Sequence, residues 1–343
     1  MILNFTQRQM ARKLNSEINA FLDRLKTEYK KGQLPEKYYY IFLSFFESFH
    51  AALENGDTNA IKQFNTFLDL SLRNLQSPYQ FPLYHQKIRT PFDYYRFSVD
   101  FFRPIVDFAN SKVLGEENII AIEKLLKNGQ NVVLFANHQT EPDPQFISLL
   151  LEKKHPDLAD KIIFVAGEKV TTDTLAIPFS MGTDLLCIYS KKYIDNPPEN
   201  QLQKQLHNKK TMKKMQELLI EGSKIIYVAP SGGRDRADKN GLIIPSLFDP
   251  KSIEMFYLMA QRAKTHTHFY PLALATYHLF PPPETTKKEI GEERHTKKSP
   301  ISLSLGNEID MKSFDTILDK EEKRSKRANF IYNKMLAEYH KIS

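Results

Sequence analysis

The chain has 343 residues, of which 41% are hydrophobic and 26% are charged, with a net charge of +7 and one cysteine. This length predicts one large domain with a smaller one, and the composition is typical of a globular protein with a full core. No run approaches the roughly 18 apolar residues of a membrane-spanning helix, which excludes a membrane-spanning chain. A single cysteine can form neither an internal disulfide nor a cysteine cluster, which excludes a disulfide scaffold.

Residues 1–76 have the pattern of helices. Apolar residues recur at helical spacing from Met10 to Tyr29, and Gly32 with Pro35 ends this first helix. An unusually aromatic helix is predicted for about 36–54, and a third ends near residue 75. Short connections between three helices predict a small bundle domain over residues 1–76. Its aromatic stripe most simply forms the bundle core, and a lipid-contacting face is the alternative.

The second domain is predicted for residues 77–343. Prolines at 78, 82 and 91 argue against a continuous helix in the connector 77–95, so the boundary falls there. Helices are expected at 94–113, 117–127, 144–153, 199–220, 250–263 and 318–341. Strands are expected at 132–136, 162–166, 185–189, 225–229, 271–275 and 301–305. This alternation predicts an α/β domain whose mixed, largely parallel sheet is covered by helices.

The stretch NHQTEPDP directly follows the strand expected at 132–136. His138 and Asp143 would lie at a strand-to-helix connection, where open α/β sheets place ligands. A carboxylate beside an imidazole fixes its tautomer and stabilises its protonated form, which makes the imidazole a usable base toward a hydroxyl. In the structural alternative His138 braces a loop and Asp143 caps the next helix, with Pro144 in its first turn.

Two later strands also end in polar loops. The loop PSGGRDR contains Ser231, Arg234 and Arg236, and two glycines that would let the backbone approach an anion. Guanidinium groups bind phosphate oxygens through paired hydrogen bonds, although an Arg–Asp ion-pair loop without a ligand is the alternative. The loop SKKY offers Lys191 and Lys192. No nucleotide-binding glycine motif is present.

Three further features have simple structural interpretations. The lysines of the 199–220 helix form a solvated face or dock an acidic partner (Lys209, Lys210, Lys213, Lys214). The mixed-charge stretch 284–300 is expected to be an exposed loop or hairpin. Cys187 lies in an apolar run and is expected to be a core residue rather than a nucleophile.

Several motifs, in order, resemble one family. They are FDYYRF (92–97), NVVLFANHQTEPDP (131–144), FVAGEKVTTD (164–173), PFSMG (178–182), LLCIYSKK (185–192), IYVAPSGGRDRAD (226–238) and PLALA with PPP (271–283). Over roughly residues 77–310 the chain is similar to the soluble glycerol-3-phosphate acyltransferases of plastids and some bacteria. That family also carries a helical bundle ahead of its α/β domain.

The resemblance implies transfer of an acyl group from an acyl thioester to the sn-1 hydroxyl of glycerol 3-phosphate, giving lysophosphatidate. It implies that His138 is the base and Asp143 its orienting partner. It also implies that Arg234, Arg236 and Lys192 bind the phosphate. Position 193 departs from the family, because Tyr193 stands where a histidine is usual. Tyr193 and Ser231 complete the set of residues that we expect to bind the substrate.

The expected partners are glycerol 3-phosphate and an acyl donor, with acyl-acyl carrier protein and acyl-CoA both open. We expect no cofactor, no metal and no nucleic-acid partner, and any contact with a membrane to be peripheral. The expected location is the bacterial cytoplasm or the plastid stroma. The alternatives are a related lysophospholipid acyltransferase and a non-catalytic protein that binds anions or lipid head groups.

Overall fold

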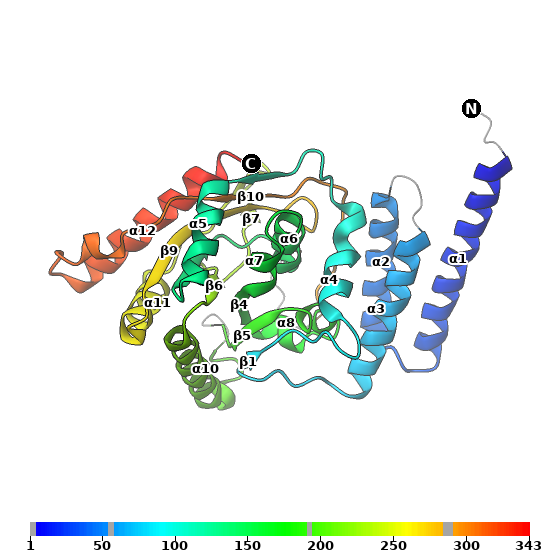
Figure 1. Ribbon diagram of the computed structural model, residues 1–343. Coiled ribbons are helices and arrows are strands. Elements are labelled where there is room, and N and C mark those ends of the chain that lie inside the picture. Colours follow the sequence, from blue (N-terminus) through cyan, green and yellow to red (C-terminus); the bar gives the residue numbers. More distant parts are fainter. Residues whose placement is uncertain (1–4, 54–57, 191–193, 284–290) are drawn as a thin grey trace.

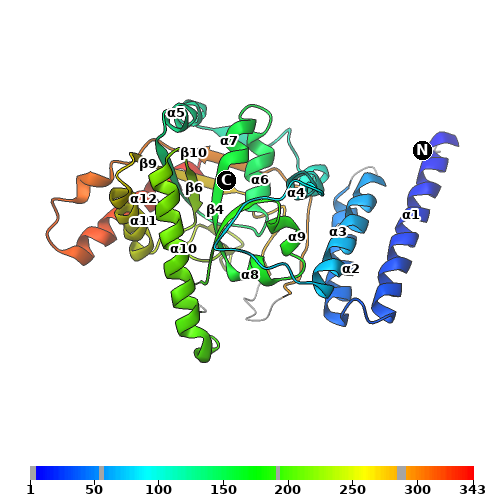
Figure 2. The same cartoon turned by 60° about the horizontal axis from the view of Figure 1, so that its bottom comes forward.

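The structure is a computed structural model that describes residues 5–53, 58–190, 194–283 and 291–343. Three long helices lie beside an α/β domain in both views of the ribbon (Figures 1 and 2). These helices are α1 (Phe5–Lys30), α2 (Glu36–Ala52) and α3 (Thr58–Gln76). The α/β fold and the N-terminal helices predicted from the sequence are confirmed.

The aromatic stripe of α2 is core, as its simpler interpretation predicted. Phe42, Phe45 and Phe49 are fully buried, and the cluster continues without a break into helices of the second domain. The ring of Phe45 lies 5.8 Å from that of Phe101 on α4 (Tyr94–Phe102), and Phe67 lies 5.1 Å from Phe179 on α9 (Ile177–Ser180). The boundary after residue 76 stays a prediction, because apolar packing crosses it.

One eight-stranded sheet organises the second domain, in the order β1-β5-β4-β6-β3-β9-β10-β2. The strands are β1 (Tyr84–His85), β2 (Lys112–Leu114), β3 (Asn131–Ala136), β4 (Ile162–Gly167), β5 (Asp184–Ile188), β6 (Ile225–Val228), β9 (Thr267–Ala275) and β10 (Ser302–Leu305). From β5 to β9 all neighbours are parallel, whereas β1 and β10 run antiparallel to their neighbours β5 and β9. The loops after the parallel strands therefore leave the same edge of the sheet.

Strand β3 lies between β6 and β9 and is buried along its whole length. Because side chains alternate along a strand, Val133 and Phe135 face one apolar cluster and Val132 and Leu134 face the other. Helices α10 (Gln201–Glu221), α11 (Pro250–Ala263) and α12 (Lys320–Tyr339) cover the first face. Helices α5 (Glu116–Lys127), α6 (Asp143–Leu151) and α7 (Pro156–Lys161) cover the second.

The helix expected over 94–113 is wrong beyond residue 102. Pro104 lacks the amide donor that a continuing helix needs, so α4 gives way to a short 3-10 turn (Arg103–Ile105) and then to β2. The sequence patterns also miss short elements: α8 (Glu168–Thr172), α9, α7, the edge strands β1 and β2, and the two-stranded ribbon of β7 (Arg236–Ala237) and β8 (Ile243–Ile244).

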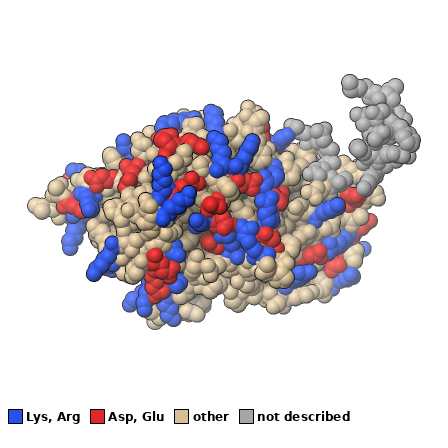
Figure 3. Space-filling model, in the orientation of Figure 1, with Lys and Arg blue, Asp and Glu red and all other residues tan. Residues whose placement is uncertain are grey.

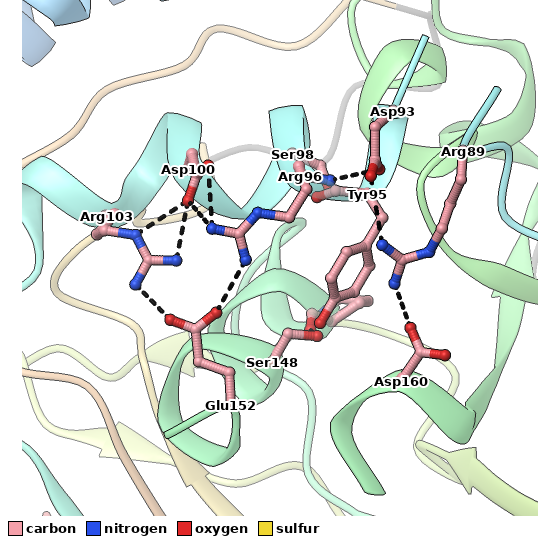
Figure 4. A network of polar contacts seen from close by, with 11 residues as sticks. Arg89, Asp93, Tyr95, Arg96, Ser98, Asp100, Arg103, Ser148, Glu152 and Asp160 are labelled. Carbon is pink, nitrogen blue, oxygen red and sulfur yellow. Dashed lines mark hydrogen bonds and ion pairs between the residues drawn. The ribbon is translucent and has the colours of Figure 1, made fainter. Parts of the chain in front are cut away.

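Ion pairs tie α4 to the far end of α6 (Figure 4). Arg96 of α4 and Arg103, the residue after it, both contact Glu152, the residue after α6, and both also pair with Asp100. Each pair is partly exposed, and such pairs typically contribute about 0.2–1 kcal/mol. Their shared carboxylates nevertheless form one connected network, which braces the helix that begins at Asp143.

Candidate active site

The residue before His138 is locked to the two strands on either side of β3. The side chain of Asn137 accepts a hydrogen bond from the Leu274 amide at 2.8 Å and donates one to the Leu274 carbonyl at 2.9 Å. The Tyr227 hydroxyl donates to the Asn137 carbonyl at 2.8 Å. His138 therefore leaves a rigid strand end, and its backbone position is set by the centre of the sheet.

His138 and Asp143 contact each other as the spacing predicted. Nδ1 of His138 lies 2.8 Å from Oδ2 of Asp143, and the two side chains are 30% and 1% exposed. An ionised carboxylate only accepts hydrogen bonds, so the proton belongs on Nδ1 and the lone pair on Nε2. Within the described part of the chain, Nε2 has no hydrogen-bond partner. The side chain is partly exposed, so Nε2 is open to a substrate group.

Asp143 accepts five hydrogen bonds, which come from His138, the Gln139 amide, the Thr140 amide and hydroxyl, and the Thr276 hydroxyl. Burial raises the pKa of the Asp143 carboxyl, but its bonds to His138 and the threonine hydroxyls outweigh this and leave the pKa below its ordinary value. The carboxylate is therefore ionised in the working pH range. The expectation that Asp143 caps the next helix is wrong: Asp143 is the first residue of α6 and Pro142 precedes it, because the Asp143 carboxylate turns toward His138 and the threonines instead.

The arginine loop lies directly against His138. The Asp235 amide donates a hydrogen bond of 2.6 Å to the His138 carbonyl. The Asp235 side chain is buried and accepts from Asn137 and from the Ser246 amide, and burial raises its pKa. Because side chains alternate along extended chain, Arg234 and Arg236 are expected on the side opposite to Asp235.

Both arginines have protein partners on that side. Arg234 Nη2 pairs with Glu292, and the Arg234 side chain is 11% exposed. Arg236 Nη1 donates to the Pro283 carbonyl at 2.6 Å. Ser231 sits at the turn before them, with its hydroxyl donating to the Gly233 carbonyl at 3.0 Å.

The expectation of an exposed loop at 284–300 is wrong for only some of the residues that the structure describes there: Glu293, His295, Lys297 and Lys298 are exposed, whereas the residues that alternate with them are buried. Glu292, Arg294 and Thr296 are 6%, 1% and 4% exposed; residues 284–290 lie outside the described part. We call residues 291–296 the strap. It runs across the loop end of the sheet, where Glu292 also pairs with Lys169 at the start of α8.

Arg294 of the strap holds two further loops. Its guanidinium donates to Glu141, two residues before Asp143, and to Asp173, each at 3.1 Å. Burial lowers its pKa, but the charges of Glu141 and Asp173 outweigh this and raise it above the ordinary value. Sequence reasoning missed Glu292 and Arg294 because no periodicity marks them. Their burial depends on partners more than 50 residues away along the chain.

The remaining predicted residues divide into three groups. Lys192 and Tyr193, like Lys191, lie outside the described residues. Cys187 is buried, and burial raises the pKa of its thiol to about 12, which fits a core residue and not a nucleophile. The α10 lysines are mostly exposed, and across the face seen in Figure 3 basic and acidic side chains are interspersed.

No helix among the described residues is long and apolar enough to cross a bilayer. The described residues also contain no group of three or more His, Cys, Asp or Glu side chains that could hold a metal ion.

Residues 110–275 match the Acyltransferase family. The chain is 38% identical over 325 residues to a chloroplastic glycerol-3-phosphate acyltransferase of Spinacia oleracea, covering 93% of this chain and 69% of that one. It is 38% identical over 328 residues to the chloroplastic glycerol-3-phosphate acyltransferase ATS12 of Cucurbita moschata, covering 93% and 70%. A solved structure, the 1-acyl-sn-glycerophosphate acyltransferase PlsC of Thermotoga maritima, aligns with a TM-score of 0.39 at 14% identity, over 95% of this chain and 98% of that one.

Both relatives are named glycerol-3-phosphate acyltransferases, which is the family that the motifs of residues 92–283 resemble. They favour the enzyme over the non-catalytic alternative. Because the identity is 38% over 93% of this chain and about 70% of each relative, the chain belongs to the glycerol-3-phosphate acyltransferase family.

Proposed function

We propose that the protein transfers a fatty acyl group from an acyl thioester to the sn-1 hydroxyl of glycerol 3-phosphate, with His138 as general base and Asp143 as its orienting partner. The hydrogen bond between the Asp235 amide and the His138 carbonyl carries this proposal. This contact supports the proposal because it joins the backbone of the arginine loop to that of His138, so a phosphate held by the loop would lie near the imidazole. The names of the relatives support the choice of acceptor.

The chemical step uses the lone pair on Nε2. As the substrate hydroxyl oxygen forms a bond to the thioester carbonyl carbon, His138 accepts the hydroxyl proton and becomes an imidazolium. The buried Asp143 carboxylate stabilises that charge through Nδ1. The carbon–sulfur bond then breaks, and the departing thiolate takes up the proton. General-base assistance of this kind typically contributes about a hundred- to ten-thousand-fold.

We assign the phosphate to Arg234, Arg236 and Lys192, with Ser231 and Tyr193 as neighbouring hydrogen-bond donors. A guanidinium has five N–H donors, and Glu292 uses only the Nη2 end of Arg234 among the described residues. The other donors of Arg234 would then be available to phosphate oxygens. Binding the phosphate first also fixes where the hydroxyl lies, which lowers the entropy cost of the reaction.

We propose either acyl-acyl carrier protein or acyl-CoA as the donor and the plastid stroma or the bacterial cytoplasm as the location, with any membrane contact peripheral. The names of the relatives as chloroplastic support the plastid among these. Steady-state assays with both donor types would rank them by kcat/KM.

The test of the reaction is incubation of the purified protein with glycerol 3-phosphate and each donor, followed by identification of the product. We expect 1-acyl-glycerol 3-phosphate from the wild type and none above background from His138→Ala, with both proteins equally folded by circular dichroism. Wild-type turnover by His138→Ala would refute the base assignment. Acylation of a lysophospholipid instead of glycerol 3-phosphate would refute the acceptor.

A further inference from the structure

The Glu292 carboxylate bridges two cations that come from different strands. Oε1 contacts Lys169 Nζ, which follows β4, and Oε2 contacts Arg234 Nη2, which follows β6. The side chain of Glu292 is 7% exposed, that of Arg234 is 11% exposed and that of Lys169 is 31% exposed. The bridge therefore lies mostly out of water, where a charge-assisted hydrogen bond holds its geometry well.

The carboxylate stays charged under working conditions. Burial raises the pKa of Glu292, but Arg234 and Lys169 outweigh this and lower the pKa to about 2. Two positive side chains at adjacent loop ends repel each other unless a negative group lies between them. Glu292 provides that group, and the backbone on which it stands is itself held, because the Gly291 amide donates to Asp173 and Arg294 anchors the other side.

We propose that Glu292 is a positioning residue for the phosphate-binding cations: it holds Arg234, and with it Lys169, in the orientation that receives the phosphate of the acceptor. The proposal rests on the proposed function, since it deepens the role given there to Arg234. It adds Lys169 to the cations at this site.

The physical reason is preorganisation. A long arginine side chain has many rotamers, and binding an anion costs the entropy of that freedom. Because Glu292 fixes one end of the guanidinium before substrate arrives, less freedom remains to be lost. The opposite role, a carboxylate that merely neutralises the cations and competes with the phosphate, predicts that removing its charge tightens substrate binding.

The test compares Glu292→Gln with Glu293→Gln. Glutamine keeps the shape of Glu292, but its amide oxygen can accept from only one cation and its NH2 group opposes the other. Glu293 is the adjacent residue, its side chain is 63% exposed, and its substitution removes the same charge. We expect the KM for glycerol 3-phosphate to rise about tenfold or more in Glu292→Gln, with the KM for the acyl donor unchanged, and neither to change in Glu293→Gln.

Binding without turnover gives a second readout. Glycerol 3-phosphate alone should raise the melting temperature of the wild type and of Glu293→Gln, and should raise that of Glu292→Gln by less at the same concentration. In an Arg234→Ala background, Glu292→Gln should raise the KM by a smaller factor than in the wild type, because Glu292 acts through Arg234.

An unchanged or lowered KM for glycerol 3-phosphate in a folded Glu292→Gln variant would overturn the positioning role. The positioning role would also be overturned if Glu292→Gln raised the KM by the same factor in the Arg234→Ala background as in the wild type. If instead the wild type neither turns over glycerol 3-phosphate nor gains stability from it, the proposed function itself is refuted. That outcome is read from the wild type alone and is distinct from any effect of Glu292→Gln.

Discussion

Replacing Asp143 by asparagine separates the charge of this residue from its shape. The carboxylate oxygens have different surroundings: Oδ1 accepts from the Thr140 amide and from two threonine hydroxyls, whereas Oδ2 accepts from His138 and the Gln139 amide. Hydroxyls can accept as well as donate, but amides cannot. The asparagine NH2 group is therefore expected at the Oδ1 position, where only the Thr140 amide loses its acceptor.

In this orientation the asparagine oxygen still accepts from His138 Nδ1, so the tautomer survives and only the charge is lost. Unit charges about 4 Å apart interact by about 4 kcal/mol at an effective dielectric constant of about 20. Part of that energy stabilises the partly formed imidazolium in the transition state. With about 1.4 kcal/mol for each factor of ten, we expect kcat to fall about a hundred- to a thousand-fold.

The assay is steady-state kinetics of Asp143→Asn with glycerol 3-phosphate and a saturating acyl donor, alongside thermal unfolding. Asp157→Asn, at an exposed position on α7, is the matched control and should leave kcat unchanged. The orphaned Thr140 amide should cost about 1–3 kcal/mol of stability. A folded Asp143→Asn variant with wild-type kcat would refute the role of the carboxylate charge.

Three further outcomes are expected. Arg234→Ala should raise the KM for glycerol 3-phosphate about tenfold or more at unchanged donor KM; a change in donor KM alone would contradict its role. Glu292 has its pKa lowered from 4.5 to about 2, so its ion pairs stabilise the fold above pH 4.5 and weaken as the pH falls toward 2. The difference in the free energy of unfolding by urea between the wild type and Glu292→Gln should therefore shrink as the pH falls through that range. A constant difference would contradict the stabilising role of the Glu292 ion pairs. Cys187, with its thiol pKa raised to about 12, should resist iodoacetamide at about pH 8 until the protein is unfolded.

The sheet and its loop end were largely predictable from the sequence. Buried parallel strands are continuous apolar runs, and all six expected strands are present within a few residues of their predicted bounds. The polar loops that follow β3 and β6 must then leave one edge, which is why the proximity of His138 to the arginine loop could be anticipated. The contact of His138 with Asp143 followed from the same reasoning, since a turn joins them.

Elements that depend on a neighbour instead of on their own pattern were not predictable. The edge strands β1 and β2 are two and three residues long, and each exists because an adjacent strand offers it hydrogen bonds. Periodicity is too weak a signal at such lengths.

The sequence by itself therefore determined the layered α/β architecture and the meeting of His138, Asp143 and the loop that carries the arginines, because apolar periodicity and parallel topology are local and general. Only the tertiary structure decided that Glu292 and Arg294 of the strap are buried. Charged side chains are buried where partners offset their desolvation, and the partners of Glu292 and Arg294 come from loops after β3, β4 and β6. No stretch of sequence contains that information, since it arises when the folded sheet brings those loops together.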